Sequence, residues 1–266
     1  GKIAKHTYER KQRMNRKKAL CICASEKKNG RGEGISHYIC KILEENLAKK
    51  RIAAATIDLR EASLTPCDGC GRCAREQRCG TDADFNRISD QVLEADYLFF
   101  VSPHHAPVPA RLCMFLEKVE RLAFLYRPPE PSCQPELSEK PDLPCRQEPY
   151  RKLAGIISHT EGGEKELMVC KAMVNDTIAN VLETVGFKVV PFNSRWNTGI
   201  AFVAATESRG KGKVPRKVPG NLSGKFCENS PENDPVPGYD WGKIAEKTGM
   251  YVEIVVQTSR TLYAIL

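Results

Sequence analysis

The chain has 266 residues, 41 basic and 33 acidic side chains for a formal net charge of +8, and 12 cysteines. A hydrophobic content of 41% is that of an ordinary globular protein, which excludes disordered and fibrous chains. A chain of this length folds without disulfides, and no apolar run approaches the roughly 18 residues of a membrane span. We therefore expect a soluble, cytoplasmic protein with no membrane partner, whose thiols stay reduced.

The positive charge is concentrated at one end of the chain. Residues 1–18 contain eight Lys and Arg and one acid, so this segment carries +7 and the other residues are nearly neutral together. A basic tail on a neutral body predicts a solvated N-terminal arm and argues against a nucleic-acid-binding surface.

Strands and helices are predicted to alternate along the chain. Short apolar runs predict five strands, at residues 19–24, 52–59, 97–101, 153–157 and 187–190. Apolar residues at three-and-four spacing predict helices at residues 35–47, 82–93, from 110 onward, and from the Gly162-Gly163 turn to about 185. This alternation predicts an α/β fold, an open doubly wound five-stranded parallel sheet with helices on both faces.

The predicted core domain spans residues 19–193 and carries two additions. A cysteine-rich loop occupies residues 63–80 after the second strand, and a Pro-rich insertion occupies residues 127–150. The remaining residues, 194–266, are predicted as an irregular extension. It ends in a helix over residues 241–247 and an edge strand over residues 251–256, where β-branched residues alternate.

The loop after the first strand has the composition of a phosphate site. Between Ser25 and Ser36 it combines hydroxyls, basic side chains and glycines, and it leads directly into a helix N-terminus. It lacks the GK[ST] ending of a P-loop and the GxGxxG pattern of a Rossmann dinucleotide site. A nucleotide triphosphatase and a Rossmann dehydrogenase are therefore both disfavoured.

The most specific motif is a cluster of four cysteines. Cys67, Cys70, Cys73 and Cys79 have the spacing C-x2-C-x2-C-x5-C, and glycines between them allow the loop to fold tightly. Successive two-residue gaps are typical of ligands to a 4Fe-4S cluster. Zinc also accepts four thiolates, and a loop without metal is a third reading. The other eight cysteines are scattered and are interpreted as small buried hydrophobes or spare thiols.

The phosphate loop, the cysteine motif and the Ser102-Pro103 turn together resemble the iron-sulfur flavoproteins, within the NADPH-dependent FMN reductase group of flavodoxin-like fold. The resemblance covers about residues 19–193 and implies FMN as cofactor, beside a 4Fe-4S cluster on the four cysteines. It implies that FMN contacts come from all three loops that follow the first, third and fourth strands. These residues are Ser25, Lys27, Asn29, Ile35, Ser36, Pro103, His104, His105, Ala106, His159, Thr160, Gly162 and Gly163.

Two positions depart from the family pattern. Histidine stands where the third loop normally has an aromatic residue, and the helix that follows has Leu112 followed by Cys113 in place of the usual Leu-Lys. That helix otherwise keeps the pattern through Phe115, Leu116, Glu117 and Lys118.

The preferred hypothesis is an FMN-dependent oxidoreductase that passes electrons between FMN and the cluster, because FMN exchanges two electrons and a cubane one. The electron donor is ferredoxin or NAD(P)H, the acceptor is a small molecule, and the resemblance implies a homo-oligomer. A second hypothesis is an NAD(P)H-dependent reductase of FMN, quinones, nitro or azo compounds without a functional cluster. A third is a zinc-loop protein that contacts nucleic acid through its basic arm, but no recognition helix accompanies that arm. No catalytic residue is assigned.

Overall fold

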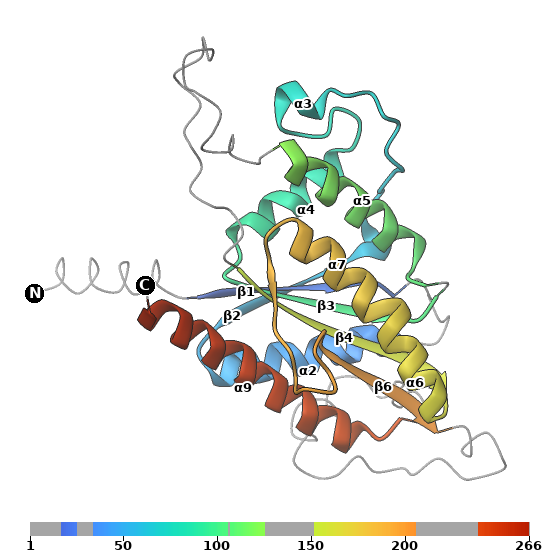
Figure 1. The fold of residues 1–266 in the computed structure, drawn as a ribbon, viewed down its shortest axis with the longest axis vertical. Helices are drawn as coiled ribbons and strands as arrows, with labels where there is room; N and C mark the ends of the chain where they lie inside the picture. Colours follow the sequence, from blue (N-terminus) through green and yellow to red (C-terminus); the bar gives the residue numbers. More distant parts are fainter. Residues whose placement is uncertain (1–16, 26–33, 106, 126–151, 206–238, 266) are drawn as a thin grey trace, which may run out of the picture.

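A parallel sheet forms the centre of the molecule (Figure 1). The computed structural model describes residues 17–25, 34–105, 107–125, 152–205 and 239–265. The strand order is β2-β1-β3-β4-β5, with β6 also paired to β4, and every pair is parallel. The strands are β1 (Lys18–Cys23), β2 (Ala53–Asp58), β3 (Tyr97–Pro103), β4 (Leu153–Gly162), β5 (Lys188–Val189) and β6 (Ile200–Ala205). The predicted doubly wound sheet is confirmed.

Helices cover both faces of the sheet (Figure 1). One face carries α2 (Ile35–Lys49) and α9 (Trp241–Ile265). The other carries α4 (Ala83–Glu94), α5 (Ala110–Leu125), and α6 (Glu164–Cys170), which continues through a π-helical turn (Lys171–Asn175) into α7 (Asp176–Thr184). Two buried clusters result because alternate residues of each strand point to opposite faces. In β1, Leu20 and Ile22 join the α4/α5 side, and Cys21 and Cys23 join the α2/α9 side.

The last sheet position is shared by two short strands laid end to end. β5 pairs with the start of β4 at Leu153 and Ala154, and β6 pairs with β4 from Ile157 onward. Ile156 lies between these two pairings, and its backbone N–H donates to the hydroxyl of Tyr251, at 3.2 Å. That hydroxyl in turn donates to the carbonyl of Val190. A side chain of α9 therefore completes the hydrogen bonding that the broken edge leaves open.

The C-terminal extension differs from the prediction in two respects. The edge strand expected over residues 251–256 is wrong, because residues 241–265 form one helix, α9, on the α2 face. Its buried positions Ile244, Thr248, Tyr251, Val252, Val255 and Val256 recur at three-and-four spacing, so packing against the sheet overrides the β-propensity of its valines. The segment 200–205, expected to be irregular, is β6. It starts at Gly199 (φ +113°), where a Cβ would lie 2.1 Å from the Ile156 carbonyl oxygen.

We expect replacement of Tyr251 by Phe to destabilise the fold by about 1–3 kcal/mol, because it leaves a buried N–H and a buried carbonyl without a partner. The free energy of unfolding from urea titration measures this. Met250→Ala, at the neighbouring half-exposed position, is the control and is expected to change stability by less than about 0.5 kcal/mol. Equal stability of the Phe variant and the native chain would show that the Tyr251 hydroxyl does not support the edge.

Several predicted segments lie outside the described residues. They include residues 1–16 of the basic arm and the whole Pro-rich insertion at 127–150. The arm's last two residues are held at the start of β1, where Asp96 accepts from the Lys17 ammonium at 2.9 Å and from the Lys18 backbone N–H at 2.8 Å. None of the described helices has the length and apolar character that crossing a bilayer requires.

Candidate functional site

The first candidate site lies where the winding of the sheet reverses. The chain passes from β1 to β2 on one side and then returns to β3 on the other, so the carboxyl ends of β1 and β3 form a switch point. Ser25 follows β1 and is buried, and the Ala24 N–H donates to the Val101 carbonyl at 2.9 Å. The α2 helix begins directly after the phosphate loop, with Gly34 as its N-cap and no acid in its first turn. Its free N–H groups suit an anion.

A buried hydrogen bond joins two of the predicted loops. The Ser36 hydroxyl, in the first turn of α2, lies 2.7 Å from Nε2 of His159 at the end of β4. The His159 carbonyl accepts from the His104 N–H at 2.9 Å, so the third loop is attached to the same residue. Pro103 is the register partner of His159 across the β3/β4 pair. Ser36, Pro103, His104 and His159, predicted from three separate loops, are thus brought together.

Of the other predicted flavin contacts, some lie within the described residues and some lie outside them. Gly162 has φ +128°, and the Gly163 N–H donates to the Glu166 carboxylate at 2.8 Å, which fixes the turn into α6. His105 is exposed at the same end of the sheet. Ile35 packs against the α2/α9 cluster. Lys27, Asn29 and Ala106 lie outside the described residues.

Tyr239 is a site residue that the sequence did not indicate. Its hydroxyl donates to the Thr160 carbonyl at 2.9 Å, and its ring meets the His159 ring edge-on, with centroids 6.2 Å apart. Burial raises the pKa of Tyr239, so the hydroxyl stays protonated and remains a donor. The sequence before Tyr239 has no hydrophobic periodicity, and a single tyrosine in such a stretch does not indicate a site.

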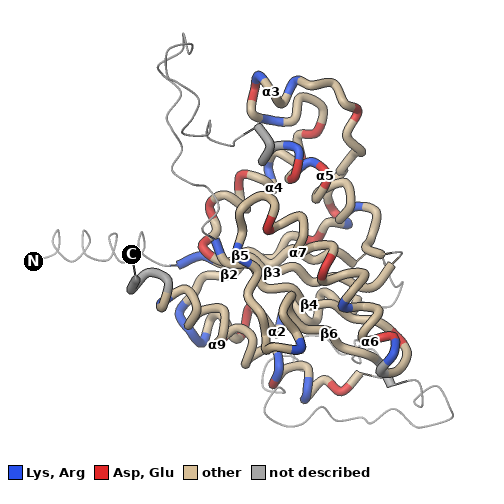
Figure 2. The backbone as a smooth tube through the Cα atoms, in the orientation of Figure 1, with Lys and Arg blue, Asp and Glu red and all other residues tan. Residues whose placement is uncertain are grey.

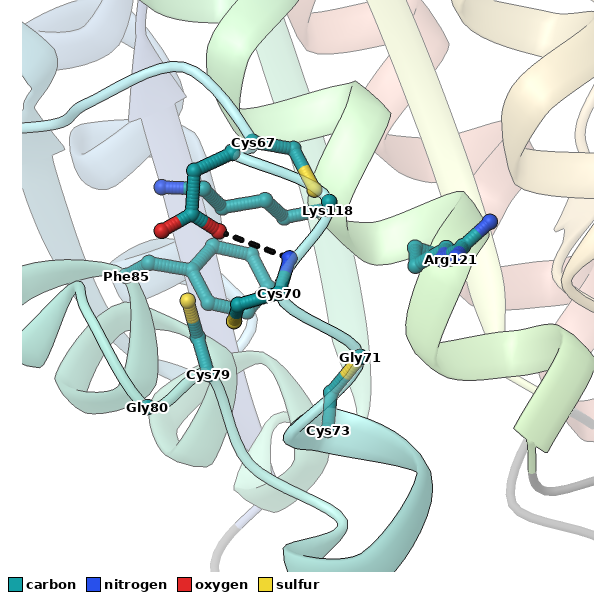
Figure 3. Close-up of a pocket in the computed structure, with 11 residues that line it drawn as sticks. Cys67, Cys70, Gly71, Cys73, Cys79, Gly80, Phe85, Lys118 and Arg121 are labelled. Carbon is teal, nitrogen blue, oxygen red and sulfur yellow. Dashed lines mark hydrogen bonds between the residues drawn. The ribbon is translucent and has the colours of Figure 1, made fainter.

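The second candidate site is the cysteine-rich loop, which projects above α4 and α5 (Figure 1). Cys67, Cys70, Cys73 and Cys79 all carry thiols outside any disulfide and line one pocket that is open to solvent (Figure 3). The loop folds tightly because Gly69 and Gly71 take φ of +69° and +68°, a conformation that favours glycine. A single helical turn, α3 (Cys73–Glu76), follows.

The two ends of this loop are closed by one buried carboxylate. Asp82 accepts from the Thr65 N–H at 2.9 Å, where the loop begins, and from the Phe85 N–H at 2.8 Å, as the N-cap of α4. It also pairs with the buried Lys118 ammonium of α5. Burial acts to raise the pKa of Asp82, but the Lys118, Thr65 and Phe85 hydrogen bonds outweigh it and hold the pKa below its usual range. Asp82 therefore holds the two ends of the cysteine-rich loop together.

Helix α5 supplies further contacts to the loop. The Glu117 carboxylate accepts from the Cys67 N–H at 3.3 Å, and the Lys118 and Arg121 side chains line the cysteine pocket (Figure 3). The sequence pattern marked Glu117 and Lys118 only as family positions, and their contact with the loop appears only once α5 is placed beside it.

The spacing of the four thiols bears on which metal they suit. Tetrahedral zinc with Zn–S bonds of about 2.3 Å holds its sulfurs about 3.8 Å apart. Within the part of the chain that the structure describes, no three of the loop thiols have sulfurs within 4.8 Å of one another. A four-iron cluster takes each thiolate at a separate iron, so its ligands stand farther apart. The donor set and its spacing fit the cluster better than zinc.

Charges of both signs are interspersed around these sites. Figure 2 shows basic and acidic residues close together on the cysteine-rich loop and on α4 and α5.

The sheet order and the loops at the carboxyl ends of its strands define an open α/β protein with a candidate ligand site at the switch point. The family model described as NADPH-dependent FMN reductase matches residues 17–181. The chain belongs to this family, a class of flavin-dependent oxidoreductases.

Individual relatives agree with this assignment. An iron-sulfur flavoprotein of Methanocaldococcus jannaschii is 29% identical over 100 residues, which cover 36% of this chain and 52% of that protein. The chain thus matches about half the length of that curated relative. Among solved structures, RosB with a bound 8-demethyl-8-formylriboflavin-5'-phosphate is 16% identical, with TM-score 0.52 over 93% of this chain and 81% of its own. A flavone reductase is 13% identical, with TM-score 0.50 over 90% and 62%. These two structures support the fold alone.

Proposed function

We propose that this protein is an FMN-dependent oxidoreductase that passes electrons between FMN and a 4Fe-4S cluster ligated by Cys67, Cys70, Cys73 and Cys79. The observation that carries the proposal is that four free thiols line one clamped pocket in a chain of the FMN reductase family. FMN, when bound, exchanges two electrons with a partner, and the cluster exchanges one.

The flavin assignment rests on the switch-point geometry. The phosphate would be held by the α2 N-terminus and the loop before it, through Ser25, Lys27, Asn29, Ile35 and Ser36. The ring would lie against residues 103–106 and the turn formed by His159, Thr160, Gly162 and Gly163. The buried Ser36 to His159 hydrogen bond fixes the two sides of this site relative to each other.

The cluster assignment rests on the loop. Its four thiols line one pocket, no three of their sulfurs lie within 4.8 Å of one another, and the Lys118 and Arg121 side chains line the same pocket. The iron-sulfur flavoprotein relative supports the same assignment. The donor is a nucleotide or another small redox partner, with ferredoxin as the protein alternative, and a homo-oligomer would bring flavin and cluster of different subunits together.

Protein purified without oxygen tests this proposal through its visible spectrum and its iron content. We expect flavin absorption bands together with about four irons per chain. The second candidate, an NAD(P)H-dependent reductase of FMN, quinones, nitro or azo compounds, is favoured by the family description, which names NADPH. It predicts flavin without iron, and protein that holds neither chromophore would contradict both.

The Ser36 to His159 pair gives a separate test of the flavin site. We expect His159→Ala to weaken FMN binding roughly tenfold, because the buried Ser36 hydroxyl loses its partner and the two loops lose their connection. His159→Gln, which can still hydrogen-bond Ser36, is expected to recover part of the affinity. Titration of apoprotein with FMN, followed by flavin fluorescence, measures both variants.

Thr184→Ala is the matched control, because the Thr184 hydroxyl is exposed and bonds only within its own helix at the far end of α7. An unchanged FMN dissociation constant in a folded His159→Ala protein would show that FMN does not bind beside the Ser36 and His159 pair.

A further inference from the structure

A second group of potential metal ligands lies on the opposite face of the sheet from the cysteine-rich loop. Cys23 ends β1, Asp58 ends β2 beside it as its register partner, and His37 comes from the first turn of α2. One ligand atom from each, a sulfur, a nitrogen and an oxygen, lie within 4.8 Å of one another. No other such trio exists among the residues that the structure describes.

The local fold explains why these three side chains meet. Neighbouring parallel strands bring Cys23 and Asp58 level, and α2 crosses above them on the face toward which Cys21 and Cys23 point. His37 and Cys40 are three residues apart and so share one side of that helix. Cysteines that are scattered in the sequence are therefore gathered between β1 and α2.

In the metal-free chain, hydrogen bonds connect the side chains of this group. Hydrogen bonds from Cys40 and His37, opposed by burial, lower the pKa of Cys23 to about 6. Burial keeps the pKa of Cys40 well above the usual range, so Cys40 stays a thiol and can donate to the Cys23 thiolate. A cysteine gives up its proton when it binds a metal ion, so binding at Cys23 would release a proton.

The charges around the group favour a cation. The Arg60 guanidinium is hydrogen-bonded to the Asp58 carboxylate, with Nε 2.8 and 3.0 Å from its two oxygens, which fixes the carboxylate beside Cys23. With Cys23 bound to a metal as a thiolate, the thiolate, the Asp58 carboxylate and the Arg60 guanidinium together carry one net negative charge, and a neutral imidazole adds a ligand without adding charge. His37 is partly exposed, whereas the Asp58 side chain is only 7% exposed, so the group lies just beneath the surface.

We propose that Cys23, His37 and Asp58 form a second metal site, which binds a divalent ion of the zinc class through one sulfur, one nitrogen and one oxygen. Zinc accepts this ligand set in tetrahedral geometry, and three protein ligands leave the fourth position open to water or another small ligand. Its three residues are neither predicted flavin contacts nor part of the cysteine-rich loop.

The experiment must separate this site from the loop thiols, which can bind zinc themselves. The full chain with Cys67, Cys70, Cys73 and Cys79 all changed to Ser is loaded with FMN, incubated with Zn²⁺ and separated from free ion by gel filtration. We expect about one zinc per chain by elemental analysis. Adding Cys23→Ser or His37→Gln to that background is expected to weaken zinc binding at least roughly tenfold. Cys113→Ser, at an exposed thiol on α5, is the control and should retain zinc.

The substitution of buried Cys23 could disturb folding, so His37→Gln, at a partly exposed residue, provides a second test of the site. Circular dichroism verifies that both variants are folded. With Co²⁺ as probe, sulfur-to-cobalt charge-transfer absorption is expected in the loop variant and lost with Cys23→Ser. Failure of the folded loop variant to retain zinc would overturn the proposal, as would retention unaffected by either substitution. Neither result bears on the iron content of the native loop, so this test and that of the proposed function fail independently.

Discussion

Replacement of Asp82 by Ala is expected to reduce the free energy of unfolding by about 3–5 kcal/mol, the largest effect of any single substitution considered for this fold. The change leaves the Lys118 ammonium buried without its carboxylate and removes the N-cap of α4. It also frees the start of the cysteine-rich loop, because the Thr65 N–H loses its acceptor. Chemical denaturation followed by circular dichroism measures the loss.

The charge state of Asp82 makes this contribution depend on pH. Its pKa in the folded chain lies below the value of about 3.9 expected for unfolded Asp. The stabilisation is therefore fully present at neutral pH and is lost as the pH falls through the folded pKa. The Ala variant should show a smaller loss of stability on acidification than the native chain.

Asp84→Ala is the matched control. Asp84 is a partly exposed acid in the first turn of the same helix and caps the Ser63 N–H, so its loss is expected to remove only about 1 kcal/mol. Lys118→Met in the Asp82→Ala background removes the uncompensated charge and should recover part of the stability. Equal losses of unfolding free energy from the Asp82 and Asp84 substitutions would contradict the claim that Asp82 holds the ends of the cysteine-rich loop together.

Replacement of Cys70 by Ser is expected to lower the iron content from about four per chain to less than one, while the flavin content stays unchanged. Cys70 is the second of the four proposed ligands, stands between Gly69 and Gly71, and is exposed, so its loss leaves the packed core intact. The loss of one thiolate opens one iron to solvent and to dissociation. Iron analysis and the visible spectrum of anaerobically purified protein measure the result.

The control variant Cys113→Ser tests whether loss of an exposed thiol outside the cysteine-rich loop lowers the iron content. Cys113 is also an exposed cysteine outside any disulfide, but it lies on α5 and is not among the residues that line the cysteine pocket. We expect full iron content in this control. If Cys70→Ser kept as much iron as Cys113→Ser, Cys70 would not be a cluster ligand.

The sheet was predictable because its central strands β1, β3 and β4 are largely buried apolar runs, such as Tyr97 to Val101, separated by helices with a clear apolar face. The cysteine-rich loop was predictable from spacing alone. The family assignment followed because each motif lies at the end of a strand, where this topology places its ligands.

The rest depended on tertiary contacts that no local pattern encodes. The valines of α9 resemble a strand until their burial against β4 and α2 is known, and β6 needs Gly199 beside Ile156 to begin. Tyr239 reaches His159 across 80 residues of sequence. The Asp82 to Lys118 pair and the Cys23 group likewise join residues that are distant in the chain.

Anaerobic reductive titration of the native protein is the most direct test of the proposal that FMN and the cluster act together. Flavin and iron-sulfur absorption are recorded as reductant is added, and electron paramagnetic resonance follows the reduced cluster. FMN takes two electrons and one cluster takes one, so we predict full reduction after about three electrons per chain. Full reduction after about two electrons, with no paramagnetic cluster signal, would contradict the account.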